Sequence, residues 1–152
     1  MKKREAYKLT INEDFTEFRF TSIGPKGNIP KIVVFKYFGG NIYNLGFGDV
    51  VENDWDDKVI TDNKDMRKVV QTVANAVHIY FDNYPDREIM IWPVDRKRKL
   101  LYNRVFKEKA EEIDLFFHVA GLDFKNSINE KYDPSYIYDA FVLKNKTRIF
   151  EK

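Results

Sequence analysis

Several features that carry chemistry in other proteins are missing from this chain. It has no cysteine in 152 residues, which excludes disulfide bonds, thiolate nucleophiles and zinc sites built on thiolates. No apolar run approaches the ~20 residues that a membrane-spanning helix needs, and no apolar segment follows the basic N-terminus as in a signal peptide. The sequence therefore predicts a soluble, cytoplasmic protein that does not act at a membrane.

Positive and negative charges nearly cancel, because the formal net charge is only +2. A value this small does not indicate nucleic-acid binding by itself, so only a local basic patch could do so. The composition is 43% hydrophobic and 33% charged, as in a globular protein, and 16% of the residues are aromatic. We therefore expect a single domain over residues 1–152, with a core built largely from rings.

The hydrophobic pattern predicts an α+β fold with the order β-β-β-α-β-α-β. Residues 16–22, 31–38 and 41–47 are expected to form an antiparallel meander with a tight turn at Gly39-Gly40. A first long helix follows, capped by Asp62 or Asn63 and ended by Asn83-Tyr84-Pro85. The other predicted elements are a buried strand at 89–92, a second long helix from 95 to a stop at 121, a last strand at 136–143, and a possible short strand at 59–60. Both helices are expected to pack on a mainly antiparallel sheet.

The most unusual feature is a basic cluster at the expected start of the second helix. Basic residues are mildly unfavourable at a helix N-terminus, which already carries partial positive charge. Helix-terminal amides and arginine side chains together can bind phosphate, and a tyrosine in the next turn could stack on a base. The candidate ligand-binding residues are Arg96, Lys97, Arg98, Lys99, Tyr102 and Arg104. The alternative is a solvated face, or pairing with the acidic segment 49–65.

Two glycine-containing motifs give weaker candidates. In Gly24-Pro25-Lys26-Gly27, Lys26 and nearby amides could hold an anion, but the Walker A spacing is absent and an ordinary hairpin turn explains the sequence. In 43–49, glycines precede Asp49 near a strand end, where the carboxylate could be a base, a metal ligand or a helix cap. The alternative for Asp49 is a structural role at a bulge.

Metal and histidine chemistry receive little support from the sequence. The acidic run Asp54-Trp55-Asp56-Asp57 lacks the spacing of an EF-hand, so we predict a solvated loop and no metal site. His78 and His118 fall on separate predicted helices and form no recognisable triad or metal motif. We predict structural or surface roles for both histidines, and no cofactor.

Three motifs resemble those of a family of small bacterial proteins of unknown function, largely from the Bacteroidota. They are Gly24-Pro25-Lys26-Gly27, the segment Tyr-Asn-Leu-Gly-Phe-Gly-Asp at 43–49, and Arg-Lys-Leu-Leu-Tyr-Asn-Arg at 98–104. The likeness extends from about Phe15 to Ile113. This resemblance implies no particular activity.

The predicted order of elements also resembles, more loosely, the core of GNAT-type acyltransferases. The resemblance implies that Tyr102, after Leu101, could act as a general acid. However, the glycine-rich loop that holds the coenzyme A pyrophosphate in that family is replaced here by the acidic segment 60–65, which would repel a pyrophosphate.

From the sequence we expect a module that binds a phosphate-bearing ligand, with nucleic acid favoured, through the basic helix N-terminus. One alternative is a divergent acyltransferase-like enzyme with Tyr102 as acid and Asp49 as base. Another is a protein-interaction module, such as one half of a toxin–antitoxin or phage-defence pair. The sequence leaves the oligomeric state and the presence of any catalysis open.

Overall fold

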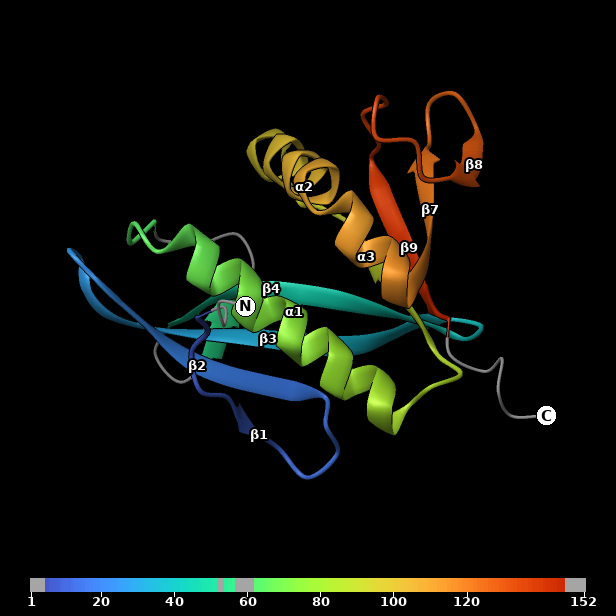
Figure 1. Ribbon diagram of the computed structural model, residues 1–152. Coiled ribbons are helices and arrows are strands. Elements are labelled where there is room, and N and C mark those ends of the chain that lie inside the picture. Colours follow the sequence, from blue (N-terminus) through green and yellow to red (C-terminus); the bar gives the residue numbers. More distant parts are fainter. Residues whose placement is uncertain (1–4, 52–53, 57–61, 147–152) are drawn as a thin grey trace. The chain divides into compact units, whose positions relative to one another are not determined.

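The computed structural model describes residues 5–51, 54–56 and 62–146. The chain forms two compact units, and each is described by itself. Unit 1 comprises Met1–Lys36 and Gly46–Pro85, and unit 2 comprises Tyr37–Leu45 and Asp86–Lys152. Strands β3 (Gly27–Gly39) and β4 (Ile42–Val51), which Figure 1 labels, each have residues in both units. The expectation of one domain over residues 1–152 stays a prediction.

Unit 1 is an antiparallel sheet covered by one helix. Strands β1 (Thr10–Ile11), β2 (Glu17–Gly24) and β3 pair in that order, and β5 (Asp54–Asp56) pairs with the second part of β4. Helix α1 (Met66–Asn83) packs on this sheet through aromatic rings. Phe35 stacks on Tyr80 with 3.9 Å between ring centroids, and Phe18 meets Phe35 edge-on. This ring-rich core agrees with the aromatic content of the sequence.

Unit 2 has a mixed sheet with the strand order β4-β6-β9-β7-β8. Strand β6 (Glu88–Ile91) is parallel to the first part of β4, whereas β9 (Ala140–Asn145), β7 (Phe117–Asp123) and β8 (Ile128–Lys131) join antiparallel. Helices α2 (Arg96–Glu108) and α3 (Ala110–Phe116) follow one another along the chain (Figure 1). Phe106 of α2 stacks on Phe141 of β9, with ring centroids 4.0 Å apart.

The structure confirms the α+β class and the mainly antiparallel pairing. The three predicted meander strands correspond to β2, β3 and β4, and the predicted strand at 89–92 corresponds to β6. Helix α1 ends before Tyr84-Pro85 as expected, because proline cannot continue a helix. The possible strand at 59–60 lies outside the described residues.

The predicted order β-β-β-α-β-α-β was wrong in its last third. The single helix expected from 95 to 121 is divided into α2 and α3 at Lys109, and Phe117 begins strand β7. The apolar stripe of α2 and α3 continues past residue 116, but Phe117–Asp123 also fits a strand, and six residues of it pair with β9. That pairing depends on residues far away in the chain, so helical periodicity alone could not reveal it.

Three further strands were missed for related reasons. Strands β1 and β5 have only two and three residues, too few to show a period, and β8 is an exposed strand of polar residues at the edge of the sheet. The last strand was expected at 136–143 but lies at Ala140–Asn145. Residues 136–139 instead approach α2 through the backbone of Tyr138.

Candidate nucleic-acid interface

Helix α2 has two chemically different faces. Its exposed side chains fall within an arc of about 120° around the axis, at 3.6 residues per turn. They are Arg96, Lys97, Leu100, Arg104, Lys107 and Glu108. We call the four cations of this face, Arg96, Lys97, Arg104 and Lys107, the basic stripe. Helix α2 contains six basic residues and one acidic residue, whereas the whole chain has a net charge of only +2, so positive charge is concentrated here.

Arg98 lies on the opposite face of α2 and is 8% exposed. Asp95, at the N-cap, accepts hydrogen bonds from the Arg98 backbone N–H at 2.8 Å and from Arg98 Nη1 at 2.7 Å. The Nε of Arg98 is buried without a hydrogen-bond partner in the described part of the chain. Because its guanidinium is enclosed and paired, Arg98 fixes the start of the helix and is poorly placed to reach a phosphate.

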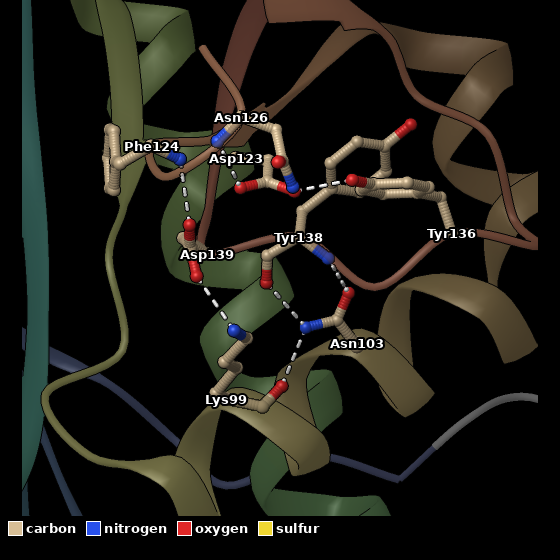
Figure 2. A network of polar contacts seen from close by, with 8 residues as sticks. All are labelled: Lys99, Asn103, Asp123, Phe124, Asn126, Tyr136, Tyr138 and Asp139. Atoms are coloured by element: carbon tan, nitrogen blue, oxygen red, sulfur yellow. Dashed lines mark hydrogen bonds and ion pairs between the residues drawn. The ribbon is translucent and has the colours of Figure 1, made fainter. Parts of the chain in front are cut away.

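Lys99 also points into unit 2. Its Nζ lies 2.7 Å from Asp139 Oδ1, and the other oxygen of Asp139 accepts a hydrogen bond from the backbone N–H of Phe124 at 2.8 Å. Figure 2 shows Lys99 and Asp139 directed toward each other from α2 and from the segment before β9. The acidic partners of Arg98 and Lys99 are thus Asp95 and Asp139, while much of the segment 49–65, with which pairing was considered, lies outside the described residues. Tyr102, the remaining candidate on α2, is half-buried.

Asn103 attaches α2 to the segment before β9. Its Nδ2 donates to the carbonyl oxygens of Lys99 at 2.8 Å and Tyr138 at 2.9 Å, and its Oδ1 accepts the Tyr138 backbone N–H at 2.9 Å (Figure 2). Both Asn103 and Tyr138 are buried. The side chain of Asn103 therefore pairs with a backbone much as a neighbouring strand would, and it fixes how α2 lies on unit 2.

Tyr138 is itself enclosed by β7 and β8. Its hydroxyl donates to Glu130 Oε2 at 2.6 Å and accepts the Asp133 backbone N–H at 3.0 Å. Burial raises the pKa of this phenol, and the bond to Glu130 adds to the shift. A Cβ at Gly121 would lie 2.5 Å from the Tyr138 ring, so only glycine fits there. Gly121, predicted to stop a helix, therefore makes room for a ring within β7.

A second carboxylate network lies at the turn after β7. Asp123 accepts hydrogen bonds from the Tyr136 hydroxyl and from the side chain and backbone of Asn126 (Figure 2). The hydroxyl of Tyr136 is the main cause that lowers the pKa of Asp123 below its usual value, followed by Asn126. These bonds fix the turn that positions Phe124.

The Gly24–Gly27 motif forms a two-residue turn between β2 and β3, in agreement with the hairpin alternative. Asn63 holds this turn, since its Oδ1 accepts the Lys26 backbone N–H at 2.7 Å and its Nδ2 donates to the Gly27 carbonyl at 2.8 Å. A Cβ at Gly24 would overlap the backbone oxygen of Asn63. The motif therefore serves packing inside unit 1, while the Lys26 side chain is exposed.

The role expected for Asp62 or Asn63 as cap of α1 was wrong. The helix begins at Met66, with Asp65 in the N-cap position, and no capping bond from the Asp65 side chain is found within the described residues. Asp65 Oδ2 instead accepts the hydroxyls of Tyr7 at 2.6 Å and Ser22 at 2.5 Å. The Asp65 carboxylate therefore bonds to residues distant in the chain instead of capping its own helix.

Replacing Gly24 by alanine tests whether the turn from Gly24 to Gly27 packs tightly against Asn63. We expect Gly24→Ala to lower the free energy of unfolding by about 1–3 kcal/mol, because backbone atoms must move to admit the methyl group. Gly39→Ala is the matched control, since a Cβ there would meet nothing within 4 Å; its effect should stay within about 0.5 kcal/mol. Urea denaturation measures both. Equal effects of the two substitutions would contradict the tight approach at Gly24.

Asp49 lies in unit 1 and is buried with Lys31. Lys31 Nζ is 2.7 Å from Asp49 Oδ1, and only 2% and 5% of the two side chains are exposed. A carboxylate held by a buried ammonium group is poorly placed to take a proton from a substrate. The structure thus favours the structural interpretation of Asp49 over its use as a base.

Unit 2 also contains a pocket of about 650 Å³ beside helices α2 and α3. Its apolar part includes Met90, Val142, Phe106 and Ile113. Lys144 lies beside Glu88 on one side and His118 on the other in the strand register. All three line the pocket. A pocket lined by both apolar and charged side chains can accept a small molecule that carries a polar group.

His118 is the pocket residue that sequence reasoning misplaced. It was assigned to the end of a helix, but it lies on β7, exposed and beside Lys144. Alternation along 117–123 was the only available signal, and the helical stripe upstream obscured it. His78 lies on α1, in unit 1, and is half-buried.

Within residues 5–51, 54–56 and 62–146, no group of three or more histidine, aspartate or glutamate side chains could hold a metal ion. None of the helices described there is both long and apolar enough to cross a membrane.

These features define an α+β protein in which one helix concentrates most of the excess positive charge. The model of a family of unknown function, DUF6934, matches residues 3–146, and the chain belongs to this family. The resemblance noted from the sequence is thereby confirmed at the level of the family. No curated protein and no solved structure matches the chain.

Proposed function

We propose that this protein binds the phosphate backbone of a nucleic acid through the basic stripe of α2. The observation that carries the proposal is the separation of charges on this helix. Arg98 and Lys99 point inward and neutralise Asp95 and Asp139, whereas the four cations of the stripe share one exposed face. Glu108 is the one acidic residue on this exposed face, so four cations stand against a single carboxylate and the outward charge of the helix stays positive.

The dimensions of the stripe suit a phosphate chain. From Arg96 to Lys107 the helix rises about 16 Å at 1.5 Å per residue, which spans several phosphates of an extended strand. Each phosphate that a cation neutralises releases counterions, so affinity falls as salt rises. Four such contacts give a slope of log affinity against log salt of about −3 for a single strand.

The double substitution Arg96→Glu/Arg104→Glu tests the proposal. We expect it to reduce the affinity for a labelled 20-nucleotide RNA at least 10-fold at low salt and to make the salt slope shallower, because two cations of the stripe become repulsive. Fluorescence anisotropy over a series of salt concentrations measures both quantities. The melting temperature should stay close to that of the unmodified protein, since both side chains are exposed.

A matched control makes the same change in charge elsewhere. Lys8→Glu/Arg67→Glu alters two exposed cations of unit 1 and should leave RNA affinity nearly unchanged. Arg98 is unsuitable for this test because its substitution would disturb the helix start. If both double variants lose RNA affinity equally, the loss reflects only the change in net charge. If the unmodified protein binds no RNA at low salt, the proposal is refuted.

The alternative of an acyltransferase-like enzyme has less support. Its base, Asp49, is held by Lys31 at 2.7 Å, and the segment 62–65 supplies Asn63 to a turn and Asp65 to Tyr7. The other alternative, a protein-interaction module such as one half of a toxin–antitoxin or phage-defence pair, has no specific observation in its favour among the described residues. Binding of nucleic acid therefore remains our proposal.

A further inference from the structure

Unit 2 displays three aromatic rings that are about half exposed. Trp92 follows β6, Phe124 follows β7 and Phe38 lies near the end of β3. Their residues are 46%, 48% and 52% exposed. The Trp92 ring centroid lies 4.9 Å from that of Phe124 and 6.4 Å from that of Phe38. We call these three residues the aromatic cluster. A contiguous group of exposed rings usually marks a binding surface, whereas scattered ones need no explanation.

The aromatic cluster lies beside the N-terminal end of α2. The two oxygens of Asp139 bind the Phe124 backbone N–H and Lys99 Nζ, so this one carboxylate joins the cluster to the first turn of the helix. Figure 2 shows Asp139 lying between the backbone N–H of Phe124 and the side chain of Lys99. Trp92 precedes Arg96 by only four residues. The aromatic cluster is therefore connected to the first turn of α2, where the basic stripe begins, through Asp139 and through the short segment from Trp92 to Arg96.

We infer that the ligand is single-stranded nucleic acid, whose bases stack on the aromatic cluster while its phosphates lie along the basic stripe. This inference rests on the proposed function. Proteins that bind single strands combine cations that follow the backbone with rings on which bases stack. Bases within a duplex are already stacked and paired, so a duplex would reach only the cations.

The charge next to the rings favours this occupant over an apolar protein surface. Arg96 and Lys97 would be brought near a partner that covers Trp92, and both would lose hydration against an apolar surface without compensation. Each nucleotide of a single strand carries both a base, which can stack on a ring, and a phosphate, which can pair with a cation. Docking of another protein is an outcome that would overturn the inference.

Trp92→Ala and Phe124→Ala test the inference. We expect each to weaken binding of a 12-nucleotide single strand by about 5- to 150-fold, the range for loss of one stacked base. The salt slope should not change, because the stripe is intact. Trp92→Phe should retain most of the affinity, since it keeps a ring. Thermal melting of each variant verifies folding.

Tyr37→Ala is the matched control. Tyr37 is 65% exposed and adjoins Phe38 in β3, but successive residues of a strand point to opposite faces. Removing this ring should leave affinity unchanged. In a Trp55→Phe background, fluorescence of Trp92 should also be quenched by the single strand and not by a duplex of the same sequence.

The outcomes separate the two proposals. If single strand and duplex bind alike and Trp92→Ala has no effect, the inference fails while binding through the stripe stands. If neither nucleic acid binds at low salt, both proposals fail. If affinity is lost equally in Tyr37→Ala and Trp92→Ala, the cluster has no special role and the inference is overturned.

Discussion

Asp49→Ala is expected to lower the free energy of unfolding by about 3–5 kcal/mol. The substitution leaves the ammonium group of Lys31, whose residue is only 1% exposed, without the carboxylate that lies 2.7 Å away. A charge buried without its counterion must lose its proton, draw in water or open the structure, and each response costs free energy. Chemical denaturation with urea measures the loss.

The double variant Lys31→Met/Asp49→Val separates two contributions to the free energy of unfolding: the net contribution of the ion pair and the cost of leaving one buried charge unpaired. We expect it to recover much of the loss, because replacing both partners by apolar groups of similar size is often nearly neutral. Glu17→Ala serves as control, since its pair with Arg19 is about half exposed and should contribute about 0–1 kcal/mol. A loss below 1 kcal/mol in Asp49→Ala would mean that Lys31 is stabilised mainly by other groups.

Asn103→Ala should be the second large effect. It removes the partners of the Tyr138 backbone N–H and carbonyl oxygen. Each buried backbone group left unsatisfied costs about 1–3 kcal/mol. The loss should appear as a lower midpoint of thermal unfolding, with unit 2 as the part affected. Hydrogen exchange of the Tyr138 amide should accelerate, because its acceptor is gone.

Two further variants test whether the loss comes from the contacts between Asn103 and Tyr138. Asn126→Ala removes an exposed asparagine that bonds to Asp123 at the turn after β7 (Figure 2), and its effect should be within about 0.5 kcal/mol. Asn103→Asp keeps an acceptor for the Tyr138 N–H but loses the donor, so we expect an intermediate loss. Unchanged exchange of the Tyr138 amide in Asn103→Ala would show that α2 does not depend on this contact.

The three motifs of the family resemblance now have different physical explanations. The first is a turn held by Asn63, and the second ends in the carboxylate that pairs with Lys31. The third combines Arg98, which fixes the start of α2 through Asp95, and Asn103, which attaches α2 to Tyr138, with exposed Arg104. Most of these residues serve stability, so the motifs by themselves say little about a ligand.

The sequence by itself determined the elements whose signals are local. The turn between Gly24 and Gly27, the end of α1 before Tyr84-Pro85 and the start of α2 at Asp95 follow from the conformational preferences of a few neighbouring residues. The hairpin turn predicted at Gly39-Gly40 lies one residue later, at Gly40 and Asn41, and of the two glycines only Gly40 has a positive φ. The α+β class also follows, because the apolar periods of long segments depend on the chain alone.

Only the tertiary structure decided which cations face outward and where β7 begins. Arg98 and Lys99 are neighbours of Lys97 in a uniform basic run. Arg98 has a local partner in Asp95, three residues before it, but the partner of Lys99, Asp139, lies forty residues away. Likewise, Phe117–Asp123 is a strand because β9 offers it a ladder of hydrogen bonds. Contacts between distant residues outweigh local preferences whenever burial and hydrogen bonding release more free energy than the preference costs.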